Sequence, residues 1–141
     1  MRLLDAADRP SGALRDRLID KGYDDETVAA VVDRLIEVGL VDDESYAQSA
    51  VRYCVGRLMG YRGAVMELAR KGVDRPLAER VCDEARMSGV FEDAAWELGR
   101  RSAAKTQGMD PKVRKRRFWY SGGRKGHDAE TLRAVAHELF D

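Results

Sequence analysis

The sequence has few of the residues on which metal centres, disulfide scaffolds and catalytic sites are usually built. Its 141 residues include two cysteines and two histidines. Cys54 and Cys82 do not stand in a CxxC or another metal-ligand spacing. They are therefore expected to be two partly buried thiols in a reducing compartment rather than a disulfide or a metal pair. We expect no metal and no cofactor, and the chain is not predicted to be an enzyme.

Long apolar runs are also missing. No segment approaches the roughly 20 apolar residues that a membrane-spanning helix needs. The stretch Met1–Leu4 is too short and too charged for a signal peptide. The sequence therefore predicts a cytoplasmic protein without membrane contact.

Proline is scarce, and strand-like alternation of polar and apolar residues is rare. The chain has 3 prolines, 44% hydrophobic residues and 35% charged residues. This composition allows a packed core and favours amphipathic helices.

What the sequence does contain is a pattern written three times. Lys-Gly-X-Asp occurs at Lys21–Asp24, Lys71–Asp74 and Lys125–Asp128, with spacings of 50 and 54 residues. Recurrence at such a period is typical of tandem structural repeats.

The first copy predicts a corner between two helices. Gly22 can adopt the left-handed backbone conformation that ends a helix. Leu18 and Tyr23 then occupy the two positions that make the apolar contact of a Schellman motif. Asp24 or Asp25 is the expected N-cap of the next helix, and Ser11 that of the helix before the corner.

Apolar residues at helical spacing follow the corners and predict three helices per repeat. Asp42-Asp43 is expected to start the third helix of the first repeat, and Pro76 suits a first helical turn. The predicted faces are Val28, Val31, Val32 and Leu35; Tyr46, Ala47, Ala50, Val51, Cys54 and Val55; Leu77, Ala78, Val81, Cys82 and Ala85; Phe91, Ala94, Ala95, Trp96 and Leu98; and Leu132, Val135, Ala136 and Leu139.

The third copy departs from the other two. Gly122 replaces Leu18 and Leu68, and Gly123 follows it. Two adjacent glycines are expected to break a helix near Ser121, so this corner is predicted to be a longer loop. His127 takes the place of Tyr23 at this corner and is predicted to be a partly buried apolar contact.

These patterns define the predicted fold class. The chain is expected to be all-α, with tandem three-helix repeats forming an elongated curved array. The predicted units are residues 1–58, residues 59–108 and a truncated third repeat, residues 109–141.

Charge is balanced overall but unevenly distributed. The chain has 25 basic and 25 acidic residues, yet residues 99–126 hold 10 Lys or Arg against one acid. Within this stretch "KVRKRRFWY" (Lys112–Tyr120) packs five cations into six residues, which would not all share one helical stripe. A solvated helix face is the usual meaning of such a run. The size of the imbalance instead favours an anion-binding surface, with nucleic acid as the expected partner. Phe118 and Trp119 are predicted to be core residues.

A second candidate surface lies where the first two repeats meet. It combines Arg52, Arg57 and Arg62 with Gly60 and Gly63. The glycines would allow a close turn between helices. The arginines either face a partner or pair with acids such as Glu67, and the sequence leaves both open.

Four segments together resemble the RecX family of RecA regulators, and the likeness covers nearly the whole chain. They are "LRDRLIDKGYD" (14–24), "GLVDDESYA" (39–47), "RYCVGRLMGYRGAVMELARKGV" (52–73) and "RKGHDAETLRAVAHEL" (124–139). The resemblance implies tandem three-helix repeats that bind the groove of the RecA nucleoprotein filament. It further implies inhibition of filament growth, ATP hydrolysis and strand exchange, in recombination and repair, without catalytic chemistry.

The expected partners are therefore the RecA filament and, weakly and without sequence preference, single- and double-stranded DNA, bound by a monomer. Two alternatives remain open: a stand-alone helix-turn-helix-like DNA-binding protein, and a helical-repeat adaptor for other proteins. Acidic starts such as "DDET" after the corners argue against the first. The candidate RecA- or DNA-binding residues are Arg52, Arg57, Arg62, Lys71, Arg100, Arg101, Lys112, Arg114, Lys115, Arg116, Arg117, Arg124 and Lys125.

Overall fold

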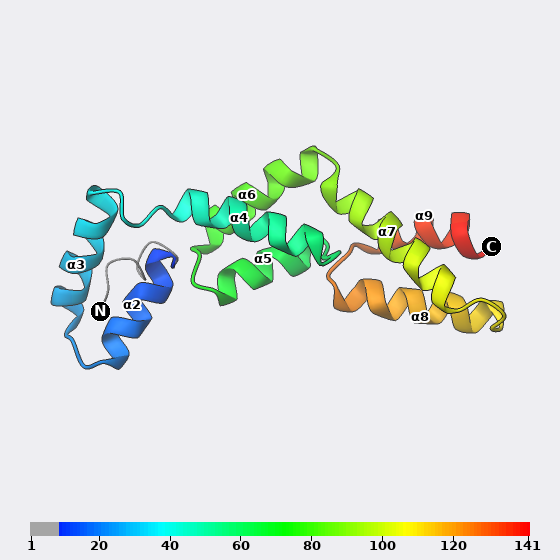
Figure 1. Ribbon diagram of the computed structural model, residues 1–141, viewed down its shortest axis with the longest axis horizontal. Helices are drawn as coiled ribbons and strands as arrows, with labels where there is room; N and C mark the ends of the chain where they lie inside the picture. Colours follow the sequence, from blue (N-terminus) through cyan, green and yellow to red (C-terminus); the bar gives the residue numbers. More distant parts are fainter. Residues whose placement is uncertain (1–8) are drawn as a thin grey trace.

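The computed structural model describes residues 9–141, and in this part of the chain every regular element is an α-helix (Figure 1). The predicted all-α class is confirmed. The helices are α2 (Ser11–Asp20), α3 (Asp25–Glu37), α4 (Asp43–Gly56), α5 (Tyr61–Arg70), α6 (Arg75–Met87), α7 (Val90–Lys105), α8 (Pro111–Arg124) and α9 (Ala129–Phe140).

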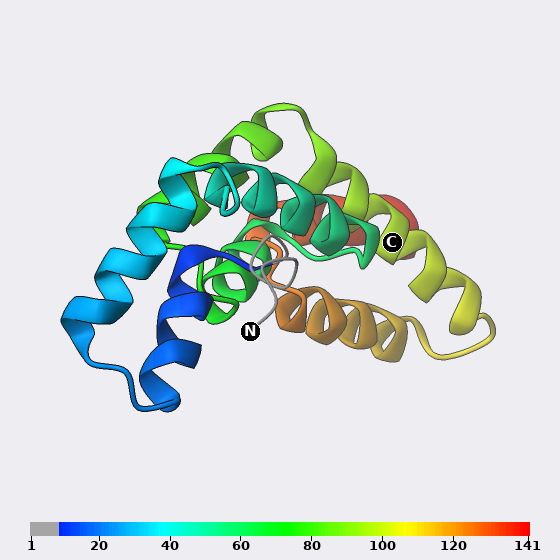
Figure 2. The same ribbon diagram turned by 60° about the vertical axis from the view of Figure 1, so that its left-hand side comes forward.

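The helices form an elongated arch rather than a sphere, as the repeat predicted. In Figure 1, α2, α5 and α8 follow one another along the lower edge of the arch. Helix α4 leads from the first group of helices to the middle one, and α7 leads from the middle group to the last. Figure 2 shows the same arch turned by 60°, with its hollow side facing down.

Three hydrophobic cores follow one another along the arch. Residues of α2 and α3 form the first, together with Val41. Residues of α4, α5 and α6 form the middle core, together with Phe91, and residues of α7, α8 and α9 form the last. Thus α4 and α7, the third helices of the predicted repeats, pack with the two helices that follow them. The division into residues 1–58, 59–108 and 109–141 describes the sequence period and stays a prediction of domain boundaries.

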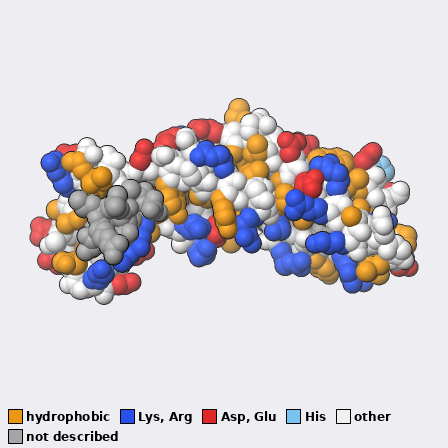
Figure 3. All heavy atoms as spheres, viewed as in Figure 1, with side chains coloured by type: hydrophobic (Ala, Val, Ile, Leu, Met, Phe, Trp, Pro, Cys, Tyr) orange, Lys and Arg blue, Asp and Glu red, His pale blue; other side chains and the backbone are white. Residues whose placement is uncertain are grey.

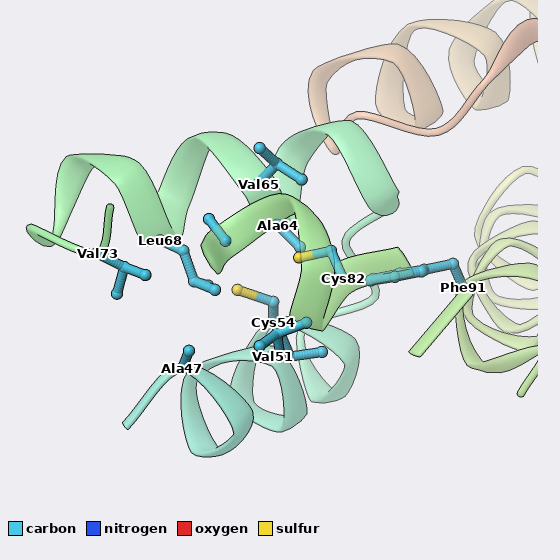
Figure 4. Packing of buried hydrophobic residues seen from close by; sticks show 11 residues of the cluster. Ala47, Val51, Cys54, Ala64, Val65, Leu68, Val73, Cys82 and Phe91 are labelled. Atoms are coloured by element: carbon cyan, nitrogen blue, oxygen red, sulfur yellow. The ribbon is translucent and has the colours of Figure 1, made fainter. Parts of the chain in front are cut away.

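Both cysteines lie in the middle core, where Figure 4 shows their sulfur atoms among aliphatic side chains. They are free thiols and fully buried, more than the sequence suggested. Burial raises the pKa of both, that of Cys82 to about 12. Both thiols are therefore protonated and unreactive at neutral pH.

The three Lys-Gly-X-Asp corners share the predicted Schellman geometry. In each, the residue after the glycine donates its N–H to the carbonyl five residues before it: Tyr23 to Leu18 at 3.3 Å, Val73 to Leu68 at 3.0 Å and His127 to Gly122 at 3.0 Å. All three glycines have positive φ, between 85° and 101°. Asp24 and Asp128 cap the next helix through their side chains, each at 2.7 Å.

The prediction of a longer loop at the third corner was wrong. Helix α8 continues through Gly122 and Gly123 to Arg124. The reason is tertiary: a Cβ on Gly122 would lie 2.3 Å from Cδ2 of Leu132, so only glycine lets α9 pack this closely. This contact overrides the low helix propensity of glycine.

Ser11 is not the N-cap of α2, which is Pro10. Ser11 is instead the first helical residue, and it binds the carboxylate of Asp43. Its N–H donates at 2.7 Å and its hydroxyl at 2.5 Å. The serine therefore ties the start of α2 to the start of α4.

The glycines of the second and third corners also pack against the helix that begins the preceding repeat. A Cβ on Gly72 would lie 2.5 Å from the nitrogen of Ala13 in α2. A Cβ on Gly126 would lie 2.1 Å from the nitrogen of Gly63 in α5. Within residues 9–141, Gly22 at the first corner has nothing within 4 Å of this position. Each of these two glycines thus ends a helix and also allows the backbones of neighbouring repeats to touch.

Helix α7 starts from another glycine turn. Gly89 is its N-cap with φ 83°, and there is open space around the position of a Cβ. The chain therefore changes direction between α6 and α7 without a tight packing contact at the turn itself.

Candidate nucleic-acid interface

Cations from three helices and the third corner converge on one hollow of about 400 Å³. The hollow lies between the end of α4, the outer half of α7 and the inner flank of α8. Its basic lining residues are Arg57, Arg101, Lys105, Arg117 and Lys125, and among residues 9–141 no acidic residue lines it. We call it the inner hollow.

A second hollow of about 440 Å³ shares Arg57 and Lys125 with the inner hollow and extends it toward α5. It adds Arg70, Lys71 and Arg124, with Glu67 as its acid. Figure 3 shows Lys and Arg side chains gathered over the α5 and α8 side of the molecule. The basic surface is defined here as the cations of both hollows: Arg57, Arg70, Lys71, Arg101, Lys105, Arg117, Arg124 and Lys125.

Most cations of the basic surface form no ion pair with an acid in the described part of the chain. Several arginines elsewhere pair with neighbouring acids, as Arg34 does with Glu37 at 3.2 Å and Arg75 with Glu79 at 3.7 Å. In the basic surface two arginines do the same: Arg70 pairs with Glu67, and Arg101 with Glu97. Within residues 9–141 the other six form no ion pair: Arg57, Lys71, Lys105, Arg117, Arg124 and Lys125. Like charges held close together in excess of the neighbouring acids favour binding of an anion.

The backbone between α4 and α5 is fixed by the third corner. Leu58 has φ 64°, a backbone conformation that residues other than glycine seldom adopt. Its carbonyl binds Nε2 of His127 at 2.8 Å, and the carbonyl of Arg57 accepts from Nζ of Lys125 at 2.9 Å. Gly60 donates its N–H to the Lys125 carbonyl at 2.8 Å. These bonds hold Arg57 beside the third repeat.

His127 is buried at the third corner, as predicted, but its ring hydrogen-bonds the Leu58 carbonyl and is not only an apolar contact. It is buried, with 7% of its surface exposed. Burial lowers its pKa, against the opposing effects of the Leu58 hydrogen bond and the charge of Asp128. The ring is therefore neutral at pH 7, and Nε2–H donates to Leu58.

The basic block of α8 divides between two flanks of the helix, so its cations do not share one stripe, as expected. Phe118 and Gly122 form the buried stripe. Arg117 lies on the flank that borders the inner hollow. Lys112, Lys115 and Arg116 lie on the other flank, which faces α9.

Arg114 lies apart from both flanks, half-buried at the turn between α7 and α8. Its Nε donates to the Thr106 hydroxyl at 3.0 Å, and Nη2 donates to the Ala103 carbonyl at 3.1 Å. Its guanidinium lies over the Phe140 ring, 5.2 Å from the centroid. These contacts show that Arg114 stabilises the turn between α7 and α8. Most of its guanidinium group is therefore not available to a partner.

The remaining predicted cations lie outside the basic surface. Arg52 donates to Ser49 and borders a different hollow, with Glu84 in its lining. Arg62 is exposed on α5, and Arg100 pairs with Glu97.

Sequence reasoning missed Arg70 and Lys105, which belong to the basic surface. Lys105 lies within the basic stretch 99–126, and Arg70 adjoins Lys71. Their positions beside predicted cations could therefore have identified both residues from the sequence. The expectation that Trp119 is a core residue was wrong. Phe118 is fully buried, as predicted, but Trp119 is 40% exposed and Tyr120 60% exposed.

No helix within residues 9–141 is both long enough and apolar enough to span a bilayer. The same residues contain no group of three or more His, Cys, Asp or Glu side chains arranged to hold a metal ion.

An arched array of helices that pack in consecutive groups defines a helical-repeat protein. Sequence comparison then gives the family. A family model described as RecX, first three-helix domain, matches residues 1–35. Regulatory protein RecX of Thermobifida fusca (strain YX) is 37% identical over 143 residues, which cover 99% of this chain and 76% of the relative. The chain belongs to the RecX family of regulatory proteins.

Two further comparisons agree. Regulatory protein RecX of Mycobacterium sp. (strain JLS) is 48% identical over 77 residues, which cover 52% of this chain but only 41% of that relative. The crystal structure of RecX from Lactobacillus salivarius has a TM-score of 0.80 at 20% identity, covering 93% of this chain and 85% of that chain. At that identity the likeness establishes the fold, and it agrees with the predicted helical array.

Proposed function

We propose that this protein regulates recombination and repair by binding the RecA nucleoprotein filament and inhibiting its extension, ATP hydrolysis and strand exchange. Membership of the RecX family supports a regulatory role. The observation that carries the proposal is the basic surface, where cations from α4, α5, α7 and α8 meet along one side of the arch. A surface that crosses several repeats suits an extended polyanionic partner better than a small ligand.

Phosphate contacts explain how such a surface would act. They dominate the affinity of proteins for nucleic acid and need no sequence code. Arg57, Lys105 and Arg117, which have no carboxylate partner among the described residues, would meet DNA phosphates in the filament. Lys71 and Arg62 would meet protein or DNA at the α5 side. Binding to DNA alone would be weak and non-specific, by a monomer.

The direct test is the DNA-dependent ATPase of RecA, measured with increasing amounts of this protein. We expect the rate of ATP hydrolysis to fall as the protein approaches stoichiometric amounts. An unchanged rate at an excess of this protein would refute the proposal.

A pair of double variants tests the surface. The first combines Lys105→Ala with Arg117→Ala and removes two cations that form no ion pair with any described acid. The control combines Arg34→Ala with Arg75→Ala, which removes the same charge from acid-paired sites outside the basic surface. The first variant should inhibit RecA less. The slope of the logarithm of its DNA-binding constant against the logarithm of salt concentration should decrease in magnitude by about two. Equal effects of both variants would show that net charge, and not this surface, is responsible.

The same preparations separate the alternatives. Sequence-specific binding to duplex DNA without RecA would indicate a stand-alone DNA-binding protein. Recovery of other proteins but not RecA in a pull-down would indicate an adaptor.

A further inference from the structure

A second cationic groove lies between α8 and α9, on the flank of α8 that faces away from the inner hollow. Its volume is about 570 Å³, within the range of ligand sites. Two aromatic side chains, Trp119 and Tyr120, line it together with Lys112, Arg116 and Arg133. We call it the aromatic groove.

The aromatic rings of this groove are not needed by the core. Phe118 fills the third core and packs against Phe140 with the rings tilted and their centroids 5.5 Å apart. Trp119 and Tyr120 remain 40% and 60% exposed. The cation–π pairs of residues 9–141 involve Tyr53, Tyr61 and Phe140, and none involves the Trp119 ring. The Trp119 ring is thus partly in water, and within residues 9–141 it forms no cation–π or aromatic pair.

The charge of the groove is positive after its own acid is accounted for. The carboxylate of Asp141 is held by Lys115 and, at 2.8 Å, by Nδ1 of His137. No ion pair with an acid is formed by Lys112, Arg116 or Arg133 in the described part of the chain. Three cations therefore surround the two rings and are available to an anionic ligand.

Helix geometry aligns these groups. Lys112, Arg116 and Trp119 are separated by four and three residues, so they lie on one flank of α8 in successive turns. Arg133 comes from α9, across the groove. A ligand with flat rings and regularly spaced negative charges matches this alternation of ring and cation.

We propose that the aromatic groove binds single-stranded nucleic acid, with a base stacked on Trp119 and the flanking phosphates on Lys112, Arg116 and Arg133. A single strand is required because the base faces of a duplex are already stacked on each other. Stacking on aromatic side chains accepts any base. An acidic peptide would use the cations but would leave the indole face unused. The groove shares no lining residue with the basic surface, so it is a second site, and the class of its ligand rests on the proposed function.

Trp119 supplies its own optical probe. The chain has two tryptophans, and Trp96→Phe leaves Trp119 as the only one. In this background an oligothymidylate should quench the fluorescence of Trp119 on binding, and a blunt duplex of equal length should quench it much less. Circular dichroism of the Trp96→Phe protein verifies that the fold is retained.

Binding variants give the second readout. Trp119→Ala should weaken oligothymidylate binding by about 5- to 150-fold, the equivalent of one lost stacking contact. Trp119→Phe should retain part of the affinity. The control Tyr23→Ala removes an exposed aromatic ring at the far end of the arch and should leave binding unchanged.

Three results would overturn the inference. One is that fluorescence anisotropy of a labelled oligothymidylate detects binding while the fluorescence of Trp119 does not change. Another is unaltered affinity of Trp119→Ala. The third is equal quenching by oligoglutamate, which would identify an acidic-peptide site instead. Inhibition of the RecA ATPase is measured separately, so loss of the groove's ligand and failure of the proposed function are distinguishable.

Discussion

The corner glycines permit one prediction that isolates the contact between repeats. We consider Gly22→Ala and Gly126→Ala, which place the same side chain in corners of the same geometry. Both positions have positive φ, 97° and 85°, so each alanine costs about 1 kcal/mol in backbone strain. At Gly22 nothing described lies within 4 Å of the new methyl group, so strain is the whole cost.

At Gly126 the methyl group meets the backbone of the neighbouring repeat. Its Cβ would lie 2.1 Å from the nitrogen and 2.5 Å from the Cα of Gly63. Backbone atoms cannot rotate away as a flexible side chain can, so α5 and the corner must separate. Overpacking of this kind costs about 1–3 kcal/mol. We therefore expect Gly126→Ala to be less stable than Gly22→Ala by about that amount.

Urea denaturation followed by far-ultraviolet circular dichroism measures both free energies of unfolding. Gly123→Ala is the positive control. It lies in α8 with open space around the new methyl group, so it should stabilise the helix by about 0.5–1 kcal/mol. Equal destabilisation by Gly126→Ala and Gly22→Ala would refute the idea that the corner glycine joins the repeats.

Three other predictions concern the last repeat. The free energy of unfolding should decrease as the pH falls below about 6.5, because buried His127 has a lowered pKa and only the unfolded state takes up the proton readily. Urea denaturation at several pH values from 7.5 to 5.5 measures this decrease, and it should be smaller in His127→Gln. Arg114→Ala should lower the free energy of unfolding by about 1.5–3 kcal/mol in the same assay, because the charge-assisted hydrogen bonds of Arg114 hold the α7–α8 turn. Arg117 is exposed, so Arg117→Ala should change this free energy by less than about 0.5 kcal/mol. Gly122→Leu, which restores the residue type of the other two corners, should destabilise by about 1–3 kcal/mol because Leu132 occupies that space, and a stable variant would mean that α9 shifts freely.

Much of the fold was predictable because the corners are local. The glycine stop, the apolar clamp and the aspartate cap lie within about ten residues, and their geometry follows from backbone sterics and hydrogen bonding. The predicted loop at Gly122 failed because Leu132 comes from another helix, and a single-sequence pattern carries no record of that contact. Ser11 failed for the same reason, since its partner Asp43 lies 32 residues away.

The sequence predicted that the site is rich in basic residues, but it did not predict which of these residues lie together on one surface. The excess of Lys and Arg in residues 99–126 indicated an anion partner. Helical geometry then separated Arg117 from Lys112 and Arg116, and the turn at Arg57 joined the end of α4 to the third repeat. Arg114 differs from its neighbours only in burial, which depends on α7 and α9.

The turn at Gly89 has a mechanical consequence for the arch. Helix α7 has 16 residues and is therefore about 24 Å long. A rotation of about 10° at its first turn would move its far end by about 4 Å, because displacement grows with the length of the lever. The bonds that Lys125 and His127 make with the turn between α4 and α5 oppose this rotation, because they join the last block to helices that precede Gly89. The pitch of the array is thus set by the third corner and not by the open turn at Gly89, so the cations on the two sides of that corner keep a constant spacing.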